Sequence, residues 1–342
     1  MIVRQATPED HARLAALAGA SPDGGAVGFR PEHHVPPGEI TRGHERSEHF
    51  VAEIDGALAG TARLDLGTCR FEGDDTRYAL LSSLQVDPAY RESGAAALLT
   101  DTRLARATEL SGEDAVTLAY VQAASAESLA NAHPWATQVL GRLVVTPVPV
   151  RQRAPRSKPG LTVRPAAPGE LAEIAAAVDA WSAGHDFARR WDAARLRDWL
   201  AASPLPDPVN HYRVVSDESG RLLAGLGIHE RGRLTSLVID RLPLFMRAAN
   251  TVLHTVPRDG RMRNLIIDKM WFAPGRLDAA RSLWETVRWE WRAAGGSLLL
   301  NHDPRDPVHR VIAARPWLPT TTSTVALRSR RPMHPETIVE QL

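Results

Sequence analysis

The hydrophobic pattern of the chain changes its period several times, and these changes predict alternating helices and strands. Residues 2–18 fit a short strand, a helix start that contains proline, and an amphipathic helix. Residues 49–64 show an apolar run, a turn and a second apolar run, which is a β-hairpin pattern. An apolar strand at 78–86, a helix at 94–110 and a strand at 115–121 follow. This order predicts an α/β fold, with helices covering a mixed sheet.

The pattern then repeats in the second half of the chain. Residues 2–18 can be laid over residues 162–178, and identical residues meet at Val3/Val163, Arg4/Arg164, Ala6/Ala166, Pro8/Pro168, Ala12/Ala172, Ala15/Ala175 and Ala16/Ala176. Two Ala-rich helices can look alike by chance, but the Val-Arg…Pro entry lies outside the Ala-rich part. We therefore interpret the similarity as an internal duplication.

The second copy continues in the same order. A hairpin pattern at 212–229 is followed by a strand at 263–272, a helix at 276–295 and a strand at 296–302. Between the copies, residues 146–160 are rich in Pro and Arg and lack periodicity. We predict a first domain at 1–150, a linker at 151–160, a second domain at 161–330 and a tail at 331–342.

Composition limits the classes of function. The chain has 342 residues, and its 41 Lys and Arg nearly balance 40 Asp and Glu, so bulk charge favours neither nucleic acid nor a membrane surface as a partner. The single cysteine, Cys69, cannot form an internal disulfide, and the N-terminus has no apolar secretory segment. No apolar stretch approaches the ~20 residues of a membrane span. We expect a cytoplasmic monomer or homodimer.

The stretch VDPAYRESGAAALLT, residues 86–100, is the strongest candidate for chemistry. It places small residues where the backbone turns from a strand into a helix. The start of a helix carries free N–H groups and a partial positive charge, so a pyrophosphate can rest directly on such a turn. Arg91 would add charge-assisted hydrogen bonds, and Gly94 would allow close approach or a positive φ. The alternative is an ordinary strand-to-helix turn.

This stretch, together with the order of elements around it, resembles the GNAT superfamily of acyl-CoA-dependent N-acyltransferases. Arg91, Gly94 and Ala96 match in order the superfamily's pyrophosphate loop, and Val86 and Pro88 match its usual lead-in. With the second copy, the chain looks like a tandem protein of two GNAT-like acyltransferase domains. The resemblance implies acetyl-CoA (CoA) as cofactor and these cofactor-binding residues: Leu84, Gln85, Val86, Arg91, Glu92, Ser93, Gly94, Ala95, Ala96, His133 and Gln138.

The resemblance also implies how the strands would hold the cofactor. The strand ending in Val86 should splay from the strand at 115–121 and leave the backbone groups of Leu84 and Val86 free for the pantetheine arm. The thioester carbonyl would then lie near backbone N–H groups, which polarise it as charge develops on its oxygen.

The catalytic groups depart from the superfamily pattern. Acylation needs an amine that is neutral at attack and an acid for the leaving thiolate. Many members supply Glu or Asp on the strand before the loop, but this chain has Ser82, Ser83 and Gln85 there and no carboxylate before Asp87. Ser83 is the candidate at this place, and water or a loop residue would accept the proton.

The superfamily's Tyr is also missing. Residues 133–145 lie over its final helix, with His133 at the usual Asn position and Leu140 at the usual Tyr position. His133, with Gln138, looks like an arrangement found in some larger GNAT proteins, and His titrates near neutrality. His133 is thus either an acid or base, or a capping or orienting residue. Tyr120 is a second acid candidate, although strand alternation places it in the core as readily as in the cleft.

Residues 21–49 occupy the place where GNAT proteins usually bind the acceptor, and we predict a lid there. The segment holds four histidines, at positions 33, 34, 44 and 49, but their spacing fits no zinc motif and no cysteine joins them, so we predict no metal site. Glu39, Glu45 and Glu48 would pair with a cationic amine or face solvent, and we expect solvent.

The second copy has lost the loop residues. With Pro88 set on Pro274, the positions of Arg91, Gly94 and Ala96 fall on Leu277, Ala280 and Ser282. Asp278 would also compete with a phosphate for the helix start. We expect that the second copy does not bind acyl-CoA.

The prediction for function is acetyl transfer from acetyl-CoA to the amine of a small molecule, with the chemistry in residues 1–150. One alternative is a non-catalytic acyl-CoA-binding or scaffold protein, motivated by the missing carboxylate and Tyr. Another is acyl transfer to a hydroxyl, or from a carrier protein, in specialised metabolism.

Overall fold

The computed structural model describes residues 1–20, 28–36, 39–40, 43–123, 125–241, 257, 259–315, 318 and 320–342. In the first half its strands are β1 (Ile2–Gln5), β2 (Gly28–His33), β3 (Arg46–Ile54), β4 (Ala57–Phe71), β5 (Asp74–Val86), β6 (Val116–Gln122) and β7 (Gln138–Pro149). The α-helices of this half are α1 (His11–Ala20), α2 (Ala95–Ser111) and α3 (Ala126–Ala132), with 3₁₀ turns at η1 (Pro8–Asp10) and η3 (Pro88–Tyr90).

The second half follows the same order. Its strands are β8 (Thr162–Pro165), β9 (His185–Asp186), β10 (Asn210–Ser216), β11 (Leu222–His229), β12 (Thr235–Arg241), β13 (Arg261–Met262), β14 (Asn264–Phe272), β15 (Ser297–His302), β16 (Thr321–Arg328) and β17 (Ile338–Val339). Its helices are α4 (Leu171–Trp181), α5 (Ala193–Ala201), α6 (Arg231–Leu234), α8 (Leu277–Glu290) and α9 (His309–Ile312), with 3₁₀ turns at η4 (Pro168–Glu170) and η5 (Trp291–Ala293). The predicted mixed α/β fold is confirmed.

The main sheet of the described chain has twelve strands in the order β1-β3-β4-β5-β6-β16-β7-β15-β14-β11-β10-β8. The first five strands and the last five correspond pairwise, because β1, β3, β4, β5 and β6 occupy the places that β8, β10, β11, β14 and β15 occupy at the other end. The two hairpins predicted from the sequence are β3 with β4 and β10 with β11, and both are antiparallel. The sheet therefore has an approximate twofold arrangement.

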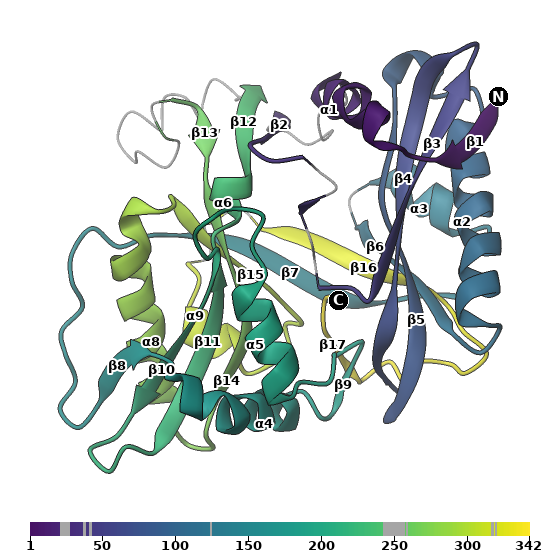
Figure 1. Ribbon diagram of the computed structural model, residues 1–342. Coiled ribbons are helices and arrows are strands. Elements are labelled where there is room, and N and C mark those ends of the chain that lie inside the picture. Colours follow the sequence, from purple (N-terminus) through teal and green to yellow (C-terminus); the bar gives the residue numbers. More distant parts are fainter. Residues whose placement is uncertain are drawn as a thin grey trace.

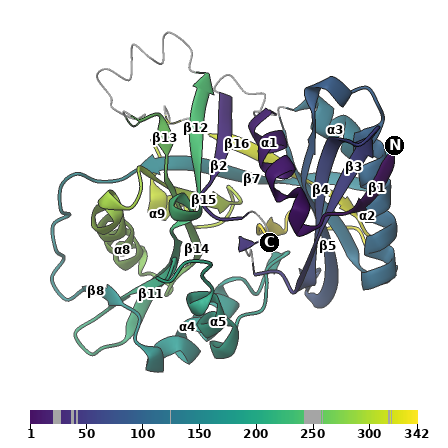
Figure 2. The same cartoon turned by 45° about the horizontal axis from the view of Figure 1, so that its top comes forward.

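The two halves exchange their final strands at the middle of this sheet. β7, from the first half, pairs antiparallel with β15 of the second half, and β16 pairs antiparallel with β6 of the first half. β7 and β16 also pair with each other, and Figures 1 and 2 show β7 crossing from one half to the other. The sheet is thus continuous along the whole chain, and the domain boundary proposed near residue 155 stays a prediction.

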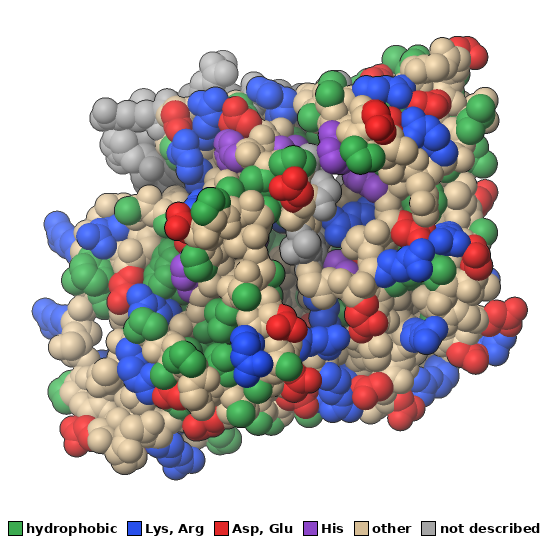
Figure 3. Space-filling view, viewed as in Figure 1, with side chains coloured by type: hydrophobic (Ala, Val, Ile, Leu, Met, Phe, Trp, Pro, Cys, Tyr) green, Lys and Arg blue, Asp and Glu red, His purple; other side chains and the backbone are tan. Residues whose placement is uncertain are grey.

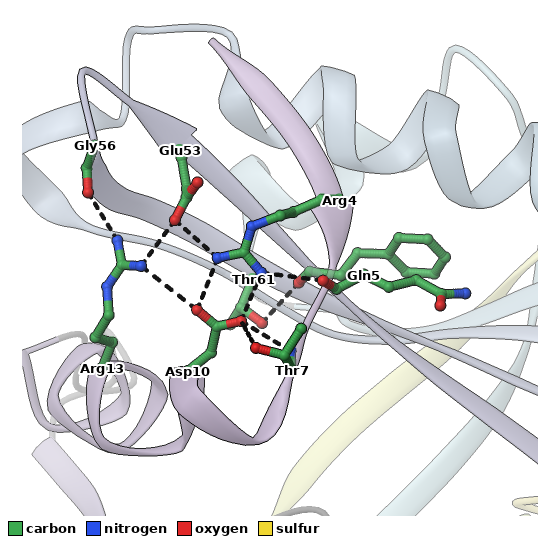
Figure 4. A network of polar contacts seen from close by, with 9 residues as sticks. Arg4, Gln5, Thr7, Asp10, Arg13, Glu53, Gly56 and Thr61 are labelled. Atoms are coloured by element: carbon green, nitrogen blue, oxygen red, sulfur yellow. Dashed lines mark hydrogen bonds and ion pairs between the residues drawn. The ribbon is translucent and has the colours of Figure 1, made fainter.

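Each half begins with the same polar pin, which explains the repeated Val-Arg…Pro pattern. In the first half, Arg4 donates to both carboxylate oxygens of Asp10 (2.6 and 2.8 Å), and Asp10 accepts the amide of Thr7 (2.9 Å). Arg13 and Glu53 complete the cluster, as Figure 4 shows. The pin ties the first helix to the edge of the sheet.

The second half repeats this pin with Ala167 in place of Thr7 and Glu170 in place of Asp10. Arg164 donates to both oxygens of Glu170 (2.8 and 2.5 Å), and Glu170 accepts the amide of Ala167 (2.8 Å). Arg164, Ala167 and Glu170 stand where the duplication places Arg4, Thr7 and Asp10. The same contacts at the same repeat positions support the interpretation of the similarity as a duplication.

Two sequence-based expectations are wrong. Residues 133–145 do not form a helix: α3 ends at Ala132, and Gln138–Pro149 is the exchanged strand β7. The apolar run Val-Leu-Gly-Arg-Leu-Val-Val pairs within the sheet, where β-branched residues fit best, and its Leu143 is buried. Glu48 does not face solvent either, because it is buried and accepts two hydrogen bonds from Arg106 of α2, each 2.9 Å long.

Candidate active site

A β-bulge interrupts the strand that leads into the phosphate loop. In the pairing of β4 with β5, Arg63 lies opposite Ser82 and Thr61 lies opposite Gln85, so Ser83 and Leu84 have no partner in the register. Ser83 has φ +53°, a left-handed conformation that costs energy in a residue with a Cβ. The bulge bends the strand and turns its backbone away from the ladder.

The neighbouring strand diverges at the same place. β5 pairs parallel with β6 over Tyr78–Leu80 and Val116–Leu118, and the pairing ends there. The expected splay between these strands is therefore present, and it begins three residues before Ser83. Tyr120 lies two residues past the last residue of β6 that pairs with β5, on the part of that strand that diverges from β5.

Helix α2 holds the bulge in position from one side. The guanidinium of Arg103 is buried and donates to the carbonyl oxygens of Ser82 and Arg63, each at 3.2 Å. Burial lowers the pKa of Arg103 to about 10, which leaves it charged at neutral pH. The sequence analysis missed this residue, because an arginine in the middle of a helix gives no signal of burial.

A second polar cluster, also missed, lies beside the bulge. Asp65 is fully buried and accepts hydrogen bonds from Ser82 (2.8 Å), Ser47 (2.6 Å) and Arg63 (2.6 Å). His44 approaches it to 3.8 Å. Burial opposes the ionisation of Asp65, but the charges of His44 and Arg63 and these hydrogen bonds keep its pKa below the ordinary value. A charged Asp65 thus fixes the strand immediately before Ser83.

The loop that follows β5 ends in an open helix start. Gly94 is the N-cap of α2 with φ +83° and ψ +4°, which is left-handed, and no atom lies within 4 Å of the position that a Cβ would take. Among the described residues, no hydrogen bond reaches the amides of Gly94, Ala96 or Ala97. No acidic residue occupies the first turn. These features make a cradle that favours an anion.

The predicted loop residues divide into those that hold the loop and those that face outward. Ser93 donates to the carbonyl of Tyr90 (2.6 Å) and accepts the amide of Ala95 (3.3 Å), and Ala95 itself is fully buried. Arg91 and Glu92 are exposed, and within the described chain the Arg91 guanidinium makes no hydrogen bond. Arg91 is therefore available to an anion at the helix start.

His133 lies at the same end of the site as the loop. It is the exposed C-cap of α3, and Trp135, two residues later, packs on the same hydrophobic cluster as Leu84, Val86 and Tyr90. The turn after α3 and the end of β5 thus pack on one hydrophobic cluster. The role of His133 stays a prediction.

Tyr120 and Gln138 contact the C-terminal segment instead. The Tyr120 hydroxyl donates to the carbonyl of Glu340 (2.8 Å) and accepts the amide of Leu342 (3.0 Å), while the Gln138 side chain accepts the amide of Met333 (3.0 Å). Burial raises the pKa of Tyr120 far above its ordinary value, so the hydroxyl keeps its proton at neutral pH. The residues predicted as a tail therefore contact two of the predicted site residues.

The second half also has the bulge, but a lysine stands there in place of the serine. Gly227 lies opposite Asp268 and Gly225 lies opposite Trp271, so Lys269 stands at the position of Ser83 and likewise has a left-handed φ, +49°. Its ammonium forms an ion pair with Asp268 (2.6 Å) and lies over the rings of two tryptophans, Trp199 at 3.9 Å and Trp191 at 4.6 Å. Burial lowers the pKa of Lys269.

The second half also closes its helix start. α8 begins after Arg276, whose φ of −103° is not left-handed, and Asp278 in the first turn forms an ion pair with Arg276 at 3.2 Å. The hydrogen bond from Arg276 and the amide of Ala279 hold the pKa of Asp278 below its ordinary value. The Asp278 carboxylate thus stays charged at the start of α8, where a phosphate would bind. This is consistent with the expected loss of acyl-CoA binding.

Metal and membrane sites were sought in the same residues. In the described ranges, no three His, Cys, Asp or Glu side chains come together as ligands. His33 and His34 instead contact the hydroxyls of Thr235 (3.2 Å) and Ser236 (2.9 Å) of β12. The predicted lid lies partly outside the described residues. No helix in the described part of the chain is long and apolar enough to cross a bilayer.

Solved structures share this fold over nearly the whole chain. N-myristoyltransferase of Saccharomyces cerevisiae with bound myristoyl-CoA matches 96% of this chain and 83% of its own, with 8% identity and a TM-score of 0.64. A GCN5-related N-acetyltransferase of Anabaena variabilis matches 95% of this chain and 72% of its own, with 13% identity and a TM-score of 0.52. At these identities the likeness shows the fold.

Sequence comparison identifies a protein family for part of the first half of the chain. No curated protein matches the chain in sequence. The model of the acetyltransferase (GNAT) family, however, matches residues 23–132, a range that includes the bulge, the loop and the whole of α2. Residues 23–132 therefore form a domain of the GNAT family of acetyltransferases.

Proposed function

We infer that the protein transfers an acetyl group from acetyl-CoA to the amine of a small molecule, and that the reaction takes place in the first half. This inference rests on two features that occur together: the helix start at Gly94 is open, and the strand at Ser83 is bulged and diverges from its neighbour. The family match and the fold support acyl transfer from an acyl-CoA, while the acetyl group and the amine are our proposal.

The residues present fit an acyl-CoA. The left-handed Gly94 leaves space above the helix start, the amides of Ala96 and Ala97 lack acceptors in the described chain, and Arg91 is exposed beside them. These groups would hold the pyrophosphate. The backbone of the bulge at Ser83 and Leu84 would face the thioester. Bound there, the cofactor would supply an activated acyl carbon and a thiolate leaving group.

The chain's own groups then have defined tasks. The amides at the bulge donate to an oxygen that gains negative charge, which stabilises it most where water is excluded. Asp65 and Arg103 keep those amides in position from either side. Tyr120 retains its proton at neutral pH and is the candidate that donates it to a thiolate. His133, exposed at the end of the site, is the candidate that accepts the proton of the amine.

Binding and turnover should be measured separately. Calorimetric titration with acetyl-CoA is expected to show binding, and thiol release against a panel of small amines is expected to show turnover. Binding without release on any amine would favour the non-catalytic acyl-CoA-binding alternative. Absence of binding would overturn the proposal altogether.

The proton donor has a matched control in the second half. Tyr120→Phe removes a buried hydroxyl that donates to the carbonyl of Glu340, and Tyr212→Phe removes one that donates to the carbonyl of Lys269, both at 2.8 Å. General acid catalysis contributes typically 100-fold or more, so kcat should fall by about that factor in Tyr120→Phe. In Tyr212→Phe it should stay near the wild-type value. Equal losses in both variants would assign Tyr120 to stability alone.

A further inference from the structure

A charged side chain without a counterion lies where the two halves meet. Arg231 opens the short helix α6, between the end of β11 at His229 and the start of β12 at Thr235. β12 pairs with β2 of the first half, and Thr235 lies opposite His33. Figure 1 shows α6 at the foot of β12, the strand that pairs with β2. Arg231 therefore lies next to the segment predicted to cover the acceptor.

In the described part of the chain, Arg231 has no hydrogen-bond or ion-pair partner. Protein surrounds its guanidinium on nearly all sides, while part of the side chain still reaches solvent. Within the described residues it makes no hydrogen bond or ion pair, although a guanidinium carries five N–H donors. Burial lowers the pKa of Arg231, and none of the described acids opposes that effect. A charge that is largely covered and unpaired in this way is costly to fold.

The neighbouring arginine shows the usual arrangement. Arg233, two residues along the same helix, lies 3.6 Å from Asp207 and 3.7 Å from Glu230, and donates to the carbonyl of Pro208 at 3.0 Å. Its charge is balanced within the protein. Carboxylates are therefore present around α6, but none of those described pairs with Arg231.

Two histidines lie close to Arg231. Burial lowers the pKa of His229 to about 4 and also lowers that of His33, and the charge of Arg231 adds to both shifts. At neutral pH both imidazoles are therefore uncharged and supply hydrogen bonds, not a counterion. Glu32, on the same strand as His33, is already paired with Arg261 (2.6 Å). Asp268, whose charge acts on His229, is paired with Lys269 (2.6 Å). Within the described residues, no carboxylate therefore forms an ion pair with Arg231.

We propose that Arg231 binds an oxyanion, a carboxylate or a phosphate, carried by the acceptor amine. An oxyanion takes two parallel hydrogen bonds from a guanidinium fork, and burial strengthens them. The surface between the halves is hollowed and has Lys, Arg and His side chains along it, as Figure 3 shows. This inference rests on the proposed function, since it names the class of acceptor for that reaction.

Matched pairs of amines test the proposal. Lysine against cadaverine differs by a carboxylate, and glucosamine 6-phosphate against glucosamine differs by a phosphate. We expect wild-type kcat/KM to favour the acidic member of one pair at least about 10-fold, and the pair that shows it identifies the oxyanion. In Arg231→Gln the preference should disappear through a rise in KM. Arg233→Gln is the control and should keep it. Equal rates within both pairs, or a preference that survives in Arg231→Gln, would overturn the proposal.

A second measurement does not depend on turnover. Inorganic phosphate should raise the melting temperature of the Gly94→Glu variant, in which the loop cradle is blocked, and should not raise that of Gly94→Glu combined with Arg231→Gln. Equal stabilisation of both variants by phosphate would overturn the proposal. If phosphate stabilises only the variant that keeps Arg231, and the protein releases no thiol from acetyl-CoA, the anion site is supported and only the proposed function is refuted.

Arg231→Met should itself melt higher than wild type, because it removes an unpaired buried charge. A lower melting temperature would reveal a partner for Arg231 and contradict the inference.

Discussion

The two halves of the molecule differ least in their strands and most at one helix start. Both keep the arginine pin, the hairpin and a bulge with a left-handed residue, Ser83 or Lys269. Only the first has an open cradle at Gly94, while Asp278 occupies the equivalent place in the second. The backbone that bends the strand is thus separable from the groups that attract an anion, and a few side chains decide which half can bind acyl-CoA.

The largest effect is expected at the cradle itself. Gly94→Glu should abolish acetyl-CoA binding, because its carboxylate would enter the space required by the pyrophosphate. The open surroundings of Gly94 leave the fold intact, at a cost of about 1–2 kcal/mol for the left-handed backbone. Calorimetry measures binding, and circular dichroism checks the fold. Gly94→Ala carries the same backbone cost without the charge and should still bind. Unchanged affinity in Gly94→Glu would refute the loop assignment.

The next effect contrasts the arginines at the two helix starts. Arg91→Ala should weaken acetyl-CoA binding about 10-fold or more, since charge-assisted hydrogen bonds are worth roughly 1.5–3 kcal/mol. Arg276→Ala should leave affinity unchanged, because Arg276 pairs with Asp278 within the protein. The same titrations should give one site per chain. A stoichiometry of two would mean that the second half binds the cofactor after all.

A smaller difference is expected between the two pins. Asp10→Ala should cost about 2 kcal/mol of unfolding free energy, because the Thr7 amide loses its acceptor and Arg4 loses one of its two carboxylates at a site where the Asp10 side chain is 3% exposed. Glu170→Ala should cost about 1 kcal/mol, since Glu170 is 21% exposed and serves one arginine. Urea denaturation compares them. A larger loss of unfolding free energy in Glu170→Ala than in Asp10→Ala would contradict the expected link between side-chain burial and the size of the loss.

The smallest effect concerns pH and the C-terminal segment. Burial opposes protonation of His185, but its hydrogen bond to Glu340 (2.7 Å) and the charges of Glu340 and Asp306 raise its pKa above 6.5. A raised pKa gives stability that is complete below about pH 6.5 and is lost as pH rises through the folded-state value. The melting temperature should therefore fall slightly from about pH 6 to about pH 8. His185→Gln should flatten this slope, and an identical slope in the variant would exclude His185 as its source.

Much of the fold followed from local sequence patterns. The hairpins, the strands at 78–86 and 263–272 and the helix starts depend on periodicity and on residues such as Pro88 and Gly94, whose preferences act over a few positions. Residues 133–145 were misassigned because the superfamily pattern suggested a helix. In the structure, this apolar run belongs to the exchanged strand β7. Long-range pairing of that kind leaves no local signal.

The site was predictable to a similar degree. The loop from Arg91 to Ala96 could be identified from spacing, because anion binding requires small residues at a helix start. Asp65, Arg103 and Arg231 could not, since their importance comes from burial and from neighbours distant in the sequence. Tyr120 was recognised as a candidate, but its contact with residues 340 and 342 emerged only from the fold.

The exchange of β7 and β16 makes the halves mutually dependent. Cutting the chain near residue 155 would leave β6 without its neighbour β16 and expose a hydrogen-bonding edge in the middle of a hydrophobic sheet, where aggregation begins. Each half therefore supplies a strand that the other needs, independently of what either half binds.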